Sequence, residues 1–395
     1  MFDLNQIQLA LREFQLDGWL LYDFRGLNVL AHRVLDIRPD SVASRRFAYF
    51  IPAVGDPKKL VHRIELASLD HLPGEKVVYL KWQELESGLE DLCRSASKIA
   101  MEYSPRNGNP YVSRVDGGTI ELVKSFGKEI VSSGDLIQYF EARWSPSQWQ
   151  LHLQADVHTR MAFELAWEMI AKRTAGGGSV TESEVQSMIM DHFHANGMTT
   201  YHPPIVGVNE NSGDPHYEPF PGKDRPIREN DFVLIDLWAK MDVADGVYSD
   251  LTKVGFVGDS VPESYEKVFR VVADARDAGI AIVKDSFENG KCLYGWQVDQ
   301  ATRDVIQAAG YGDYFVHRTG HNIGQETHGN GAHMDNLETQ EDRTVMRQTC
   351  FSIEPGIYLP EFGIRSEVDV YVDENGKVWV TGGVQNSVHP ILTAE

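Results

Sequence analysis

The sequence has little cysteine, no long apolar segment and no excess of basic residues. Only three of its 395 residues are cysteine, and they lie far apart, which does not suit a disulfide framework. No apolar run reaches the roughly 18 residues that a membrane-spanning helix requires. Basic residues number 37 against 58 acidic ones, so the formal net charge of −21 repels nucleic acid and anionic membranes. We therefore expect a soluble, cytoplasmic protein that binds neither.

The remaining composition is sufficient for two folded domains. Hydrophobic residues make up 42% of the chain, enough to bury substantial cores. Residues 1–143 alternate helical and strand-like segments, which predicts a small α/β domain. Residues 144–395 begin with a helix capped by Ser145 and Pro146, and an order of two helices followed by strands then occurs twice. We predict an α+β fold with a pseudo-duplicated C-terminal domain.

Two aspartates stand in apolar, strand-like segments of the second domain. Asp236 lies in FVLIDLW and Asp250 in VYSDLT. A hairpin folded near residue 243 would make them direct cross-strand neighbours, about 5 Å apart at Cβ. A single aspartate in a strand is usually a hydrogen-bonded structural residue. Two like charges directly opposite each other are destabilising, so a cation between them is expected.

The same arrangement occurs again near the C-terminus. Glu354 lies in SIEPGIY and Glu367 in GIRSEVDV, and a hairpin centred between Pro360 and Glu361 places the two carboxylates opposite each other. Arg365 is the one nearby basic residue. Two acid pairs on successive hairpins are difficult to explain as separate structural residues, so we predict a cluster of four carboxylates that holds metal.

Three histidines follow one another at intervals of four and seven in FVHRTGHNIGQETHG, residues 315–329. Gly320 and Gly324 lie between them, and glycine costs about 1 kcal/mol in a helix interior. A bent backbone that approaches the site closely is therefore expected. Carboxylates with one imidazole suit Mn²⁺, Co²⁺, Fe²⁺ or Zn²⁺. Shared carboxylates indicate two ions about 3.5–4 Å apart that activate a water molecule.

These residues resemble the ligand set of the pita-bread (M24) metallopeptidases, in the prolidase and aminopeptidase P branch. GHNIG, SIEPGIY, GIRSEVDV and VYSDLT resemble that family's motifs in the same order, and the resemblance covers roughly residues 145–390. The N-terminal segment resembles the creatinase-type domain that precedes the catalytic domain in prolidase. The resemblance implies a pita-bread catalytic domain over 144–395 and a creatinase-like α/β domain over 1–143.

The resemblance also implies a role for each metal ligand. Asp236 would bind one ion, His321 and Glu354 would bind the other, and Asp250 and Glu367 would bridge both. Glu354 would in addition transfer a proton between the attacking water and the leaving nitrogen. Two divalent ions are implied, with Mn²⁺ the expected one and Co²⁺, Zn²⁺ or Fe²⁺ also compatible.

Five further residues receive expected roles near the substrate. His328 would contact the scissile carbonyl and stabilise the oxyanion, His317 would lie near the leaving residue, and His216 would line the pocket. Arg365 would hold a bridging carboxylate from outside the ligand set. Arg318, which stands in HRTGH where the family has a small residue, would face solvent or bind a substrate carboxylate.

The implied activity is hydrolysis of an Xaa-Pro bond in small peptides with proline at the second position. The close spacing of Glu354 and Glu367 favours an Xaa-Pro dipeptidase (prolidase), and aminopeptidase P, which acts on longer peptides, is the alternative. Some pita-bread domains bind proteins without catalysis, but those typically lose ligands, and this chain retains all five. A homodimer is expected from the relatives.

Overall fold

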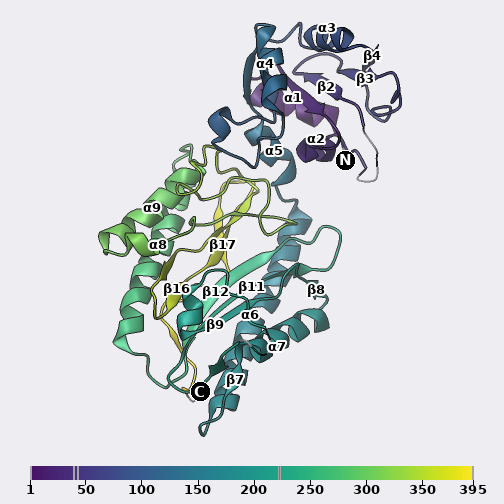
Figure 1. The fold of residues 1–395 in the computed structure, drawn as a ribbon. Helices are drawn as coiled ribbons and strands as arrows, with labels where there is room; N and C mark the ends of the chain where they lie inside the picture. Colours follow the sequence, from purple (N-terminus) through teal and green to yellow (C-terminus); the bar gives the residue numbers. More distant parts are fainter. Residues whose placement is uncertain (1, 39–40, 42–43, 221, 223, 394–395) are drawn as a thin grey trace. The chain divides into compact units, whose positions relative to one another are not determined.

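A computed structural model describes residues 2–38, 41, 44–220, 222 and 224–393. The chain forms two compact units, Met1–Glu141 and Ala142–Glu395. The two-helices-then-strands order that the sequence predicts occurs twice in the larger unit, which confirms the α+β class (Figure 1). No helix among the described residues is long and apolar enough to cross a bilayer.

The smaller unit is built on a six-stranded mixed sheet with strand order β4-β3-β2-β1-β5-β6. Side chains of β1 alternate between two apolar cores: Trp19 and Leu21 pack on one face, and Leu20 and Tyr22 pack on the other. The strands are β1 Gly18–Asp23, β2 Phe47–Pro52, β3 Lys58–His62, β4 Glu75–Tyr79, β5 Lys98–Met101 and β6 Glu129–Ser132. The helices are α1 Leu4–Glu13, α2 Val29–Val34, α3 Trp82–Leu92, α4 Gly117–Ser125 and α5 Gly134–Glu141, with a 3-10 turn η1 at Pro105–Asn107.

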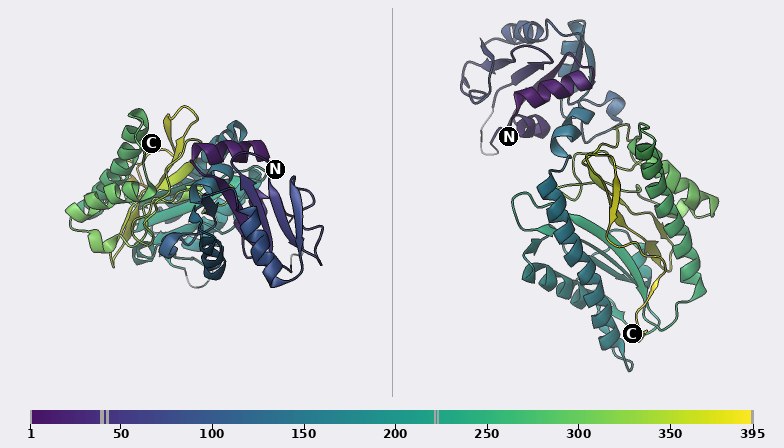
Figure 2. Two further views of the ribbon diagram at one scale, coloured as in Figure 1. Left: turned by 90° about the horizontal axis from the view of Figure 1, so that it is seen from above. Right: turned by 180° about the vertical axis from the view of Figure 1, so that it is seen from behind.

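The larger unit places two helix pairs on opposite sides of its strands, as Figures 1 and 2 show. The pairs are α6 Pro146–Thr174 with α7 Glu182–Ala195, and α8 Glu263–Glu288 with α9 Gly295–Ala308. Ser145 caps α6 and accepts the backbone N–H of Gln148, while Thr181 caps α7 in the same way with Glu184. The sequence predicted Ser145 as the cap of the first helix, and both helices form capping boxes because Ser or Thr stands three residues before Gln or Glu.

The strands of the larger unit form two principal sheets. One has the order β19-β12-β11-β8 with β9 also paired to β11, and the other has the order β13-β14-β17-β18. The strands are β7 Val180–Thr181, β8 Met198–Thr199, β9 Ile205–Val208, β10 Pro226–Ile227, β11 Phe232–Met241, β12 Ser249–Phe256, β13 Asn322–Ile323, β14 Cys350–Ile353, β15 Gly356–Tyr358, β16 Gly363–Arg365, β17 Val368–Val372, β18 Val378–Thr381 and β19 His389–Pro390. Two 3-10 turns, η2 Asn209–Gly213 and η3 Gly312–Tyr314, complete the unit.

The register of the β11–β12 hairpin differs from the predicted one. Asp236 pairs with Thr252, and Asp250 pairs with Trp238, so the two aspartates are diagonal neighbours instead of direct partners. A turn over residues 243–246, closed by an N–H···O bond of 3.0 Å, centres the hairpin near residue 244 instead of 243. The displacement is two residues, an even number, so both carboxylates still point to the same face of the sheet.

The register of the second hairpin is the predicted one. Ile353 pairs with Val368 in β14–β17, and Gly356 pairs with Arg365 in β15–β16. Glu354 and Glu367 therefore lie opposite each other in the short break between these two ladders. Neither glutamate belongs to a strand ladder, because one ladder ends at Ile353–Val368 and the other at Gly356–Arg365.

Candidate metal centre

Donor atoms from one strand and from the residues just before two other strands converge in the larger unit. Asp250 of β12, His321 just before β13 and Glu367 just before β17 each offer one ligand atom, and these atoms lie within 4.8 Å of one another. All three residues are buried, with at most 5% of their surface exposed. Buried carboxylates at this spacing are stable only when they are protonated or share a cation.

The orientation of the His321 ring shows what the cluster lacks. Nδ1 of His321 faces the backbone oxygen of Asn322 at 3.4 Å, so Nδ1 carries the hydrogen and Nε2 presents a lone pair. That Nε2 lies 3.5 Å from Oδ2 of Asp250 and 3.3 Å from Oε1 of Glu354. Burial lowers the pKa of His321 well below its usual value, so the ring is neutral. A lone pair that faces two carboxylates is the arrangement of a metal ligand.

Asp236 lies beside this group on β11 and is also buried. Arg365 donates to Oδ2 of Asp236, while Oδ1 of the same carboxylate is buried without a hydrogen-bond partner among the described residues. An unpaired buried carboxylate oxygen is costly unless a cation binds it. The sequence predicted that Arg365 holds a bridging carboxylate, but its direct partner in the structure is Asp236, the expected ligand of a single ion.

Arg365 reaches the second acid pair indirectly. Its Nε donates to the hydroxyl of Thr252 at 2.9 Å, and that hydroxyl donates to Oε2 of Glu367 at 2.7 Å. Nε also lies 3.9 Å from Oε2 of Glu354. The guanidinium therefore contacts one carboxylate directly, is close to a second, and orients a third through Thr252.

A chain of hydrogen bonds continues from Arg365 to His317. Nη1 of Arg365 donates to the Tyr358 hydroxyl at 3.1 Å, and Nε2 of His317 lies 2.7 Å from the same oxygen. Nδ1 of His317 donates to the backbone oxygen of Arg318 at 2.7 Å, so Nε2 accepts the tyrosine proton. Burial lowers the pKa of His317 to about 3, which keeps the imidazole neutral.

Burial raises the pKa of all four carboxyls in the cluster. Burial is the larger cause for Asp250 and Glu367, whose pKa values lie well above normal, and each also repels the other acids. Burial also raises the pKa of Asp236, although Arg365 acts against this shift. Burial raises the pKa of Glu354 to about 7. Arg365 alone cannot neutralise the four carboxylates of this cluster. Their oxygen atoms, together with the His321 imidazole, form a donor set that suits divalent cations.

The remaining predicted residues lie around this cluster. The ring centroids of His328 and His321 are 4.3 Å apart in an edge-to-face arrangement. His216 is exposed, but its charge acts on the pKa values of both Asp236 and His328. The charge of Arg318 acts on Glu354 and His328 as well. Contacts therefore join the five predicted ligands, Arg365, His317 and His328, while His216 and Arg318 act on the group through their charges.

Three residues of the site were not assigned a role from the sequence. Tyr358 and Thr252 link Arg365 to His317 and Glu367, as described above. The Tyr201 ring lies 5.9 Å from the Trp238 ring in a tilted arrangement, and burial, with the charges of Asp250 and Asp236, raises the pKa of its hydroxyl. Tyr358 stands in the recognised SIEPGIY element, but Tyr201 and Thr252 stand among ordinary residues and carry no signal of their own.

Comparison with known proteins agrees with this arrangement. A model of metallopeptidase family M24 matches residues 151–374. The chain belongs to this family. An uncharacterized peptidase of Schizosaccharomyces pombe is 35% identical over 383 residues, covering 92% of this chain and 77% of the relative. The predicted family and the peptidase class are confirmed.

Solved structures show the same fold over nearly the whole chain. Dipeptidase PepE from Mycobacterium ulcerans has a TM-score of 0.65 at 23% identity. The match covers 98% of this chain and 96% of the PepE chain. The Xaa-Pro dipeptidase from Bacillus anthracis has a TM-score of 0.58 at 20% identity, covering 98% of each chain. The predicted pita-bread architecture is confirmed.

Proposed function

We propose that this M24 protein is an Xaa-Pro dipeptidase that uses two divalent metal ions. The observation that carries the proposal is the convergence of Asp250, His321 and Glu367 donor atoms within 4.8 Å, with Asp236 and Glu354 beside them. Asp236 would hold one ion, His321 and Glu354 the other, and Asp250 and Glu367 both. The ions would supply Lewis acidity and lower the pKa of a bound water molecule.

The protein groups around the ions have separate tasks. Glu354, whose Oε1 lies 3.3 Å from Nε2 of His321, would take a proton from the attacking water and return it to the leaving nitrogen. His328 lies beside His321 and would donate to the scissile carbonyl oxygen as charge develops there. His317, neutral and fixed by Tyr358, would position the leaving residue. His216 would line the pocket from its exposed loop.

Arg318 supports a preference for dipeptides. Its positive charge lowers the pKa values of Glu354 and His328, which supports a guanidinium within electrostatic reach of the reacting groups. The free carboxylate of a dipeptide's proline is an anion that arginine recognises well. A longer peptide has an amide at that position and would lose this interaction.

The experiment that tests the proposal compares Ala-Pro with Ala-Pro-Ala after Mn²⁺ supplementation. We expect rapid release of proline from the dipeptide and little cleavage of the tripeptide, measured by chromatography of the products. Cleavage of both peptides would instead identify an aminopeptidase P. Cleavage of neither by protein that retains bound metal would contradict catalysis and favour a non-catalytic binding protein. Chelator-treated protein is the control.

The identity of the ion and the homodimer stay predictions. Oxygen donors with a single imidazole suit Mn²⁺, and Co²⁺, Zn²⁺ and Fe²⁺ are the competing ions. Elemental analysis of the purified protein identifies the ion that it retains, and light scattering coupled to size-exclusion chromatography gives the oligomeric state.

A further inference from the structure

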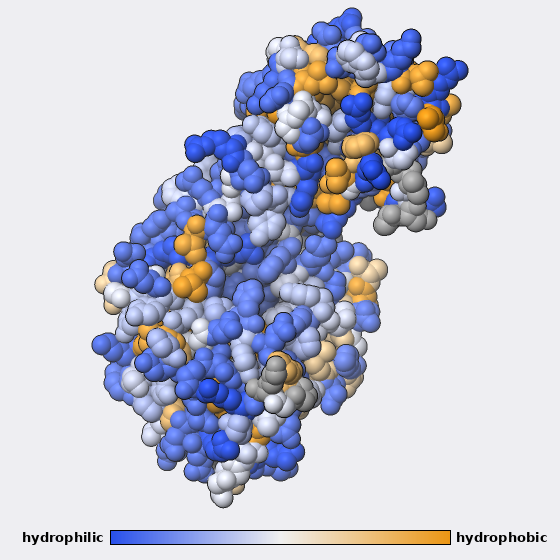
Figure 3. All heavy atoms as spheres, viewed as in Figure 1, coloured by the Kyte–Doolittle hydropathy of each residue, from blue (hydrophilic) through white to orange (hydrophobic). Residues whose placement is uncertain are grey.

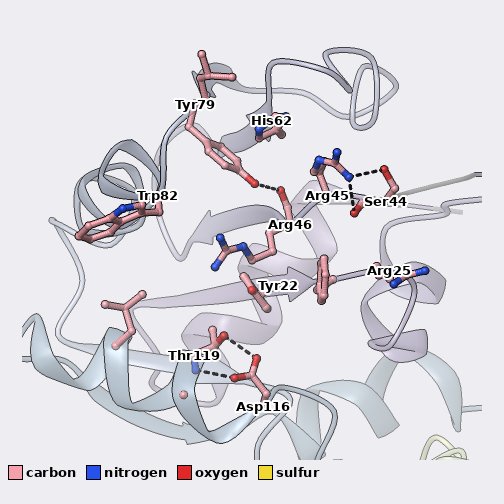
Figure 4. Close-up of a pocket in the computed structure, with 14 residues that line it drawn as sticks. Tyr22, Arg25, Ser44, Arg45, Arg46, His62, Tyr79, Trp82, Asp116 and Thr119 are labelled. Carbon is pink, nitrogen blue, oxygen red and sulfur yellow. Dashed lines mark hydrogen bonds between the residues drawn. The ribbon is translucent and has the colours of Figure 1, made fainter.

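A second candidate site lies within the smaller unit, Met1–Glu141. A cavity of about 830 Å³ is lined by residues of this unit only, between the sheet and the start of α4 (Figure 4). That volume is in the range of small-molecule sites, roughly 300–1,000 Å³. None of the residues that line it belongs to the metal centre, so the cavity requires an explanation of its own.

The cavity gathers positive charge in a strongly acidic protein. Arg25, Arg45 and Arg46 line it, and Asp116 is the one acidic residue among its lining residues. Asp116 already accepts hydrogen bonds from the backbone N–H and the hydroxyl of Thr119, at 2.9 and 2.7 Å. Neither Arg25 nor Arg46 has an ion-pair partner among the described residues, although the chain carries a net charge of −21.

Buried tyrosines hold one of these arginines in place. The hydroxyl of Tyr79 donates to the backbone oxygen of Arg46 at 2.7 Å, and both Tyr79 and Tyr22 are at most 5% exposed. Burial raises the pKa of each tyrosine, and the positive charge of Arg46 acts against that rise in both cases. The guanidinium of Arg46 therefore lies close to both tyrosine hydroxyls at the wall of the cavity.

A large aromatic surface stands at the edge of the same cavity. Trp82, the first residue of α3, is 60% exposed, and Leu80 beside it is 49% exposed. Figure 4 places the Trp82 indole on the side of the cavity toward which the Arg46 side chain extends. Hydrophobic residues form several patches on the face of this unit seen in Figure 3. An exposed indole and a guanidinium that line one cavity offer a stacking surface beside an anion site.

We propose that this cavity binds a small organic anion in which a phosphate or a carboxylate is attached to a flat ring. Arg46 and Arg25 would bind the anionic oxygens, and Tyr22 lines the same cavity. Trp82 would stack on the ring. The ligand thus needs both an anionic group and a flat ring. An anion without a ring, or a ring without a charge, would bind weakly.

Isothermal titration calorimetry on the full-length protein tests the proposal. AMP is the phosphate probe and indole-3-acetate is the carboxylate probe, while adenosine and inorganic phosphate each supply one part only. We expect at least one of the two complete probes to bind about tenfold more tightly than either partial one. Binding of AMP alone identifies a phosphate site, and binding of indole-3-acetate alone identifies a carboxylate site.

Variants assign the binding to this cavity. Arg46→Ala and Trp82→Ala should each weaken the complete probe about tenfold. Arg94→Ala, which removes an exposed arginine of the same unit outside the cavity, should leave binding unchanged. Circular dichroism and the melting temperature establish that each variant is folded, and Arg25→Ala replaces any that is not. Absence of binding by both complete probes, or binding unaffected by the arginine variants, would overturn the proposal.

Discussion

Single residues determine whether the metal centre can form, and Asp250 is the most sensitive of them. It contributes a donor atom to the closest three-residue group and is 3% exposed. Loss of a residue that only orients a ligand typically costs 10–100-fold, so loss of a ligand should cost more. We expect Asp250→Ala to lower kcat/KM for Ala-Pro by more than about 100-fold and to reduce bound metal, measured by elemental analysis. Asp259→Ala, at an exposed position, is the control, and a fully active Asp250 variant would refute the assignment.

Tyr358 acts through its neighbours, and its hydroxyl can be removed alone. In Tyr358→Phe the Arg365 guanidinium and the His317 ring lose their shared partner. We expect kcat/KM to fall about tenfold, mainly through kcat, with the metal content retained. Tyr371→Phe, which removes the hydroxyl of another buried tyrosine, is the matched control. Equal activity of the two variants would show that the hydrogen-bond chain has no part in catalysis.

The sequence predicted the acidic residues and the histidines of the centre, but not the residues that orient them. Charged residues in apolar strands are unusual, so Asp236 and Glu354 stand out along the chain. Thr252 is ordinary in a strand, and its importance arises from Glu367, which lies 115 positions away. Contacts between residues so far apart depend on tertiary structure, and no local pattern reports them.

At the scale of elements, the close approach of the His321 segment to β14 depends on one glycine. A Cβ at Gly320 would lie 1.9 Å from the backbone oxygen of Ser352, whereas a Cβ at Gly324 would meet nothing within 4 Å. The sequence led us to expect that both glycines permit a close approach, and only Gly320 does so. The other glycine is free of this constraint.

These two glycines give a matched test. Gly320→Ala forces the two backbones apart and should lower the free energy of unfolding by about 1–3 kcal/mol. Gly324→Ala should change it by less than about 0.5 kcal/mol. Urea denaturation followed by circular dichroism measures both. Similar stability of the two variants would show that the backbone contact at Ser352 relaxes easily.

Element positions were predicted well where the hydrophobic pattern is strong. The capped helices α6 and α7 begin where Ser145 and Thr181 indicate. Strands β3 and β6 give only a weak sequence signal, because KKLVH and EIVS are short and half polar. The β11–β12 hairpin was placed two residues out of register because its turn sequence allows more than one midpoint.

At the scale of the whole molecule, the acid cluster links stability to pH and to metal. The unfolded chain loses these protons near pH 4, but burial holds the pKa of Glu354 at about 7 and those of Asp250 and Glu367 well above normal. Between about pH 4 and pH 7 the folded state therefore binds more protons than the unfolded state. Each carboxyl whose pKa is raised on folding stabilises the folded protein fully at pH values below the pKa of the unfolded state. This stabilisation is lost as the pH rises through the pKa of the folded state.

Metal reverses this loss, because ions bind the folded state and compete with the protons. We expect the melting temperature of chelator-treated protein to fall between about pH 5 and pH 7. The increase in melting temperature on adding Mn²⁺ should grow over the same range. Differential scanning fluorimetry measures both series. A metal-induced increase that is constant with pH would contradict the buried acid cluster.

The duplicated plan of the larger unit has a consequence for how such a centre could arise. Asp236 and Asp250 come from strands that follow the first helix pair, while His321, Glu354 and Glu367 come from the segment after the second pair. Neither repeat alone carries all five of these residues. The candidate centre can therefore assemble only after both halves have folded against each other, and removal of either half should abolish it.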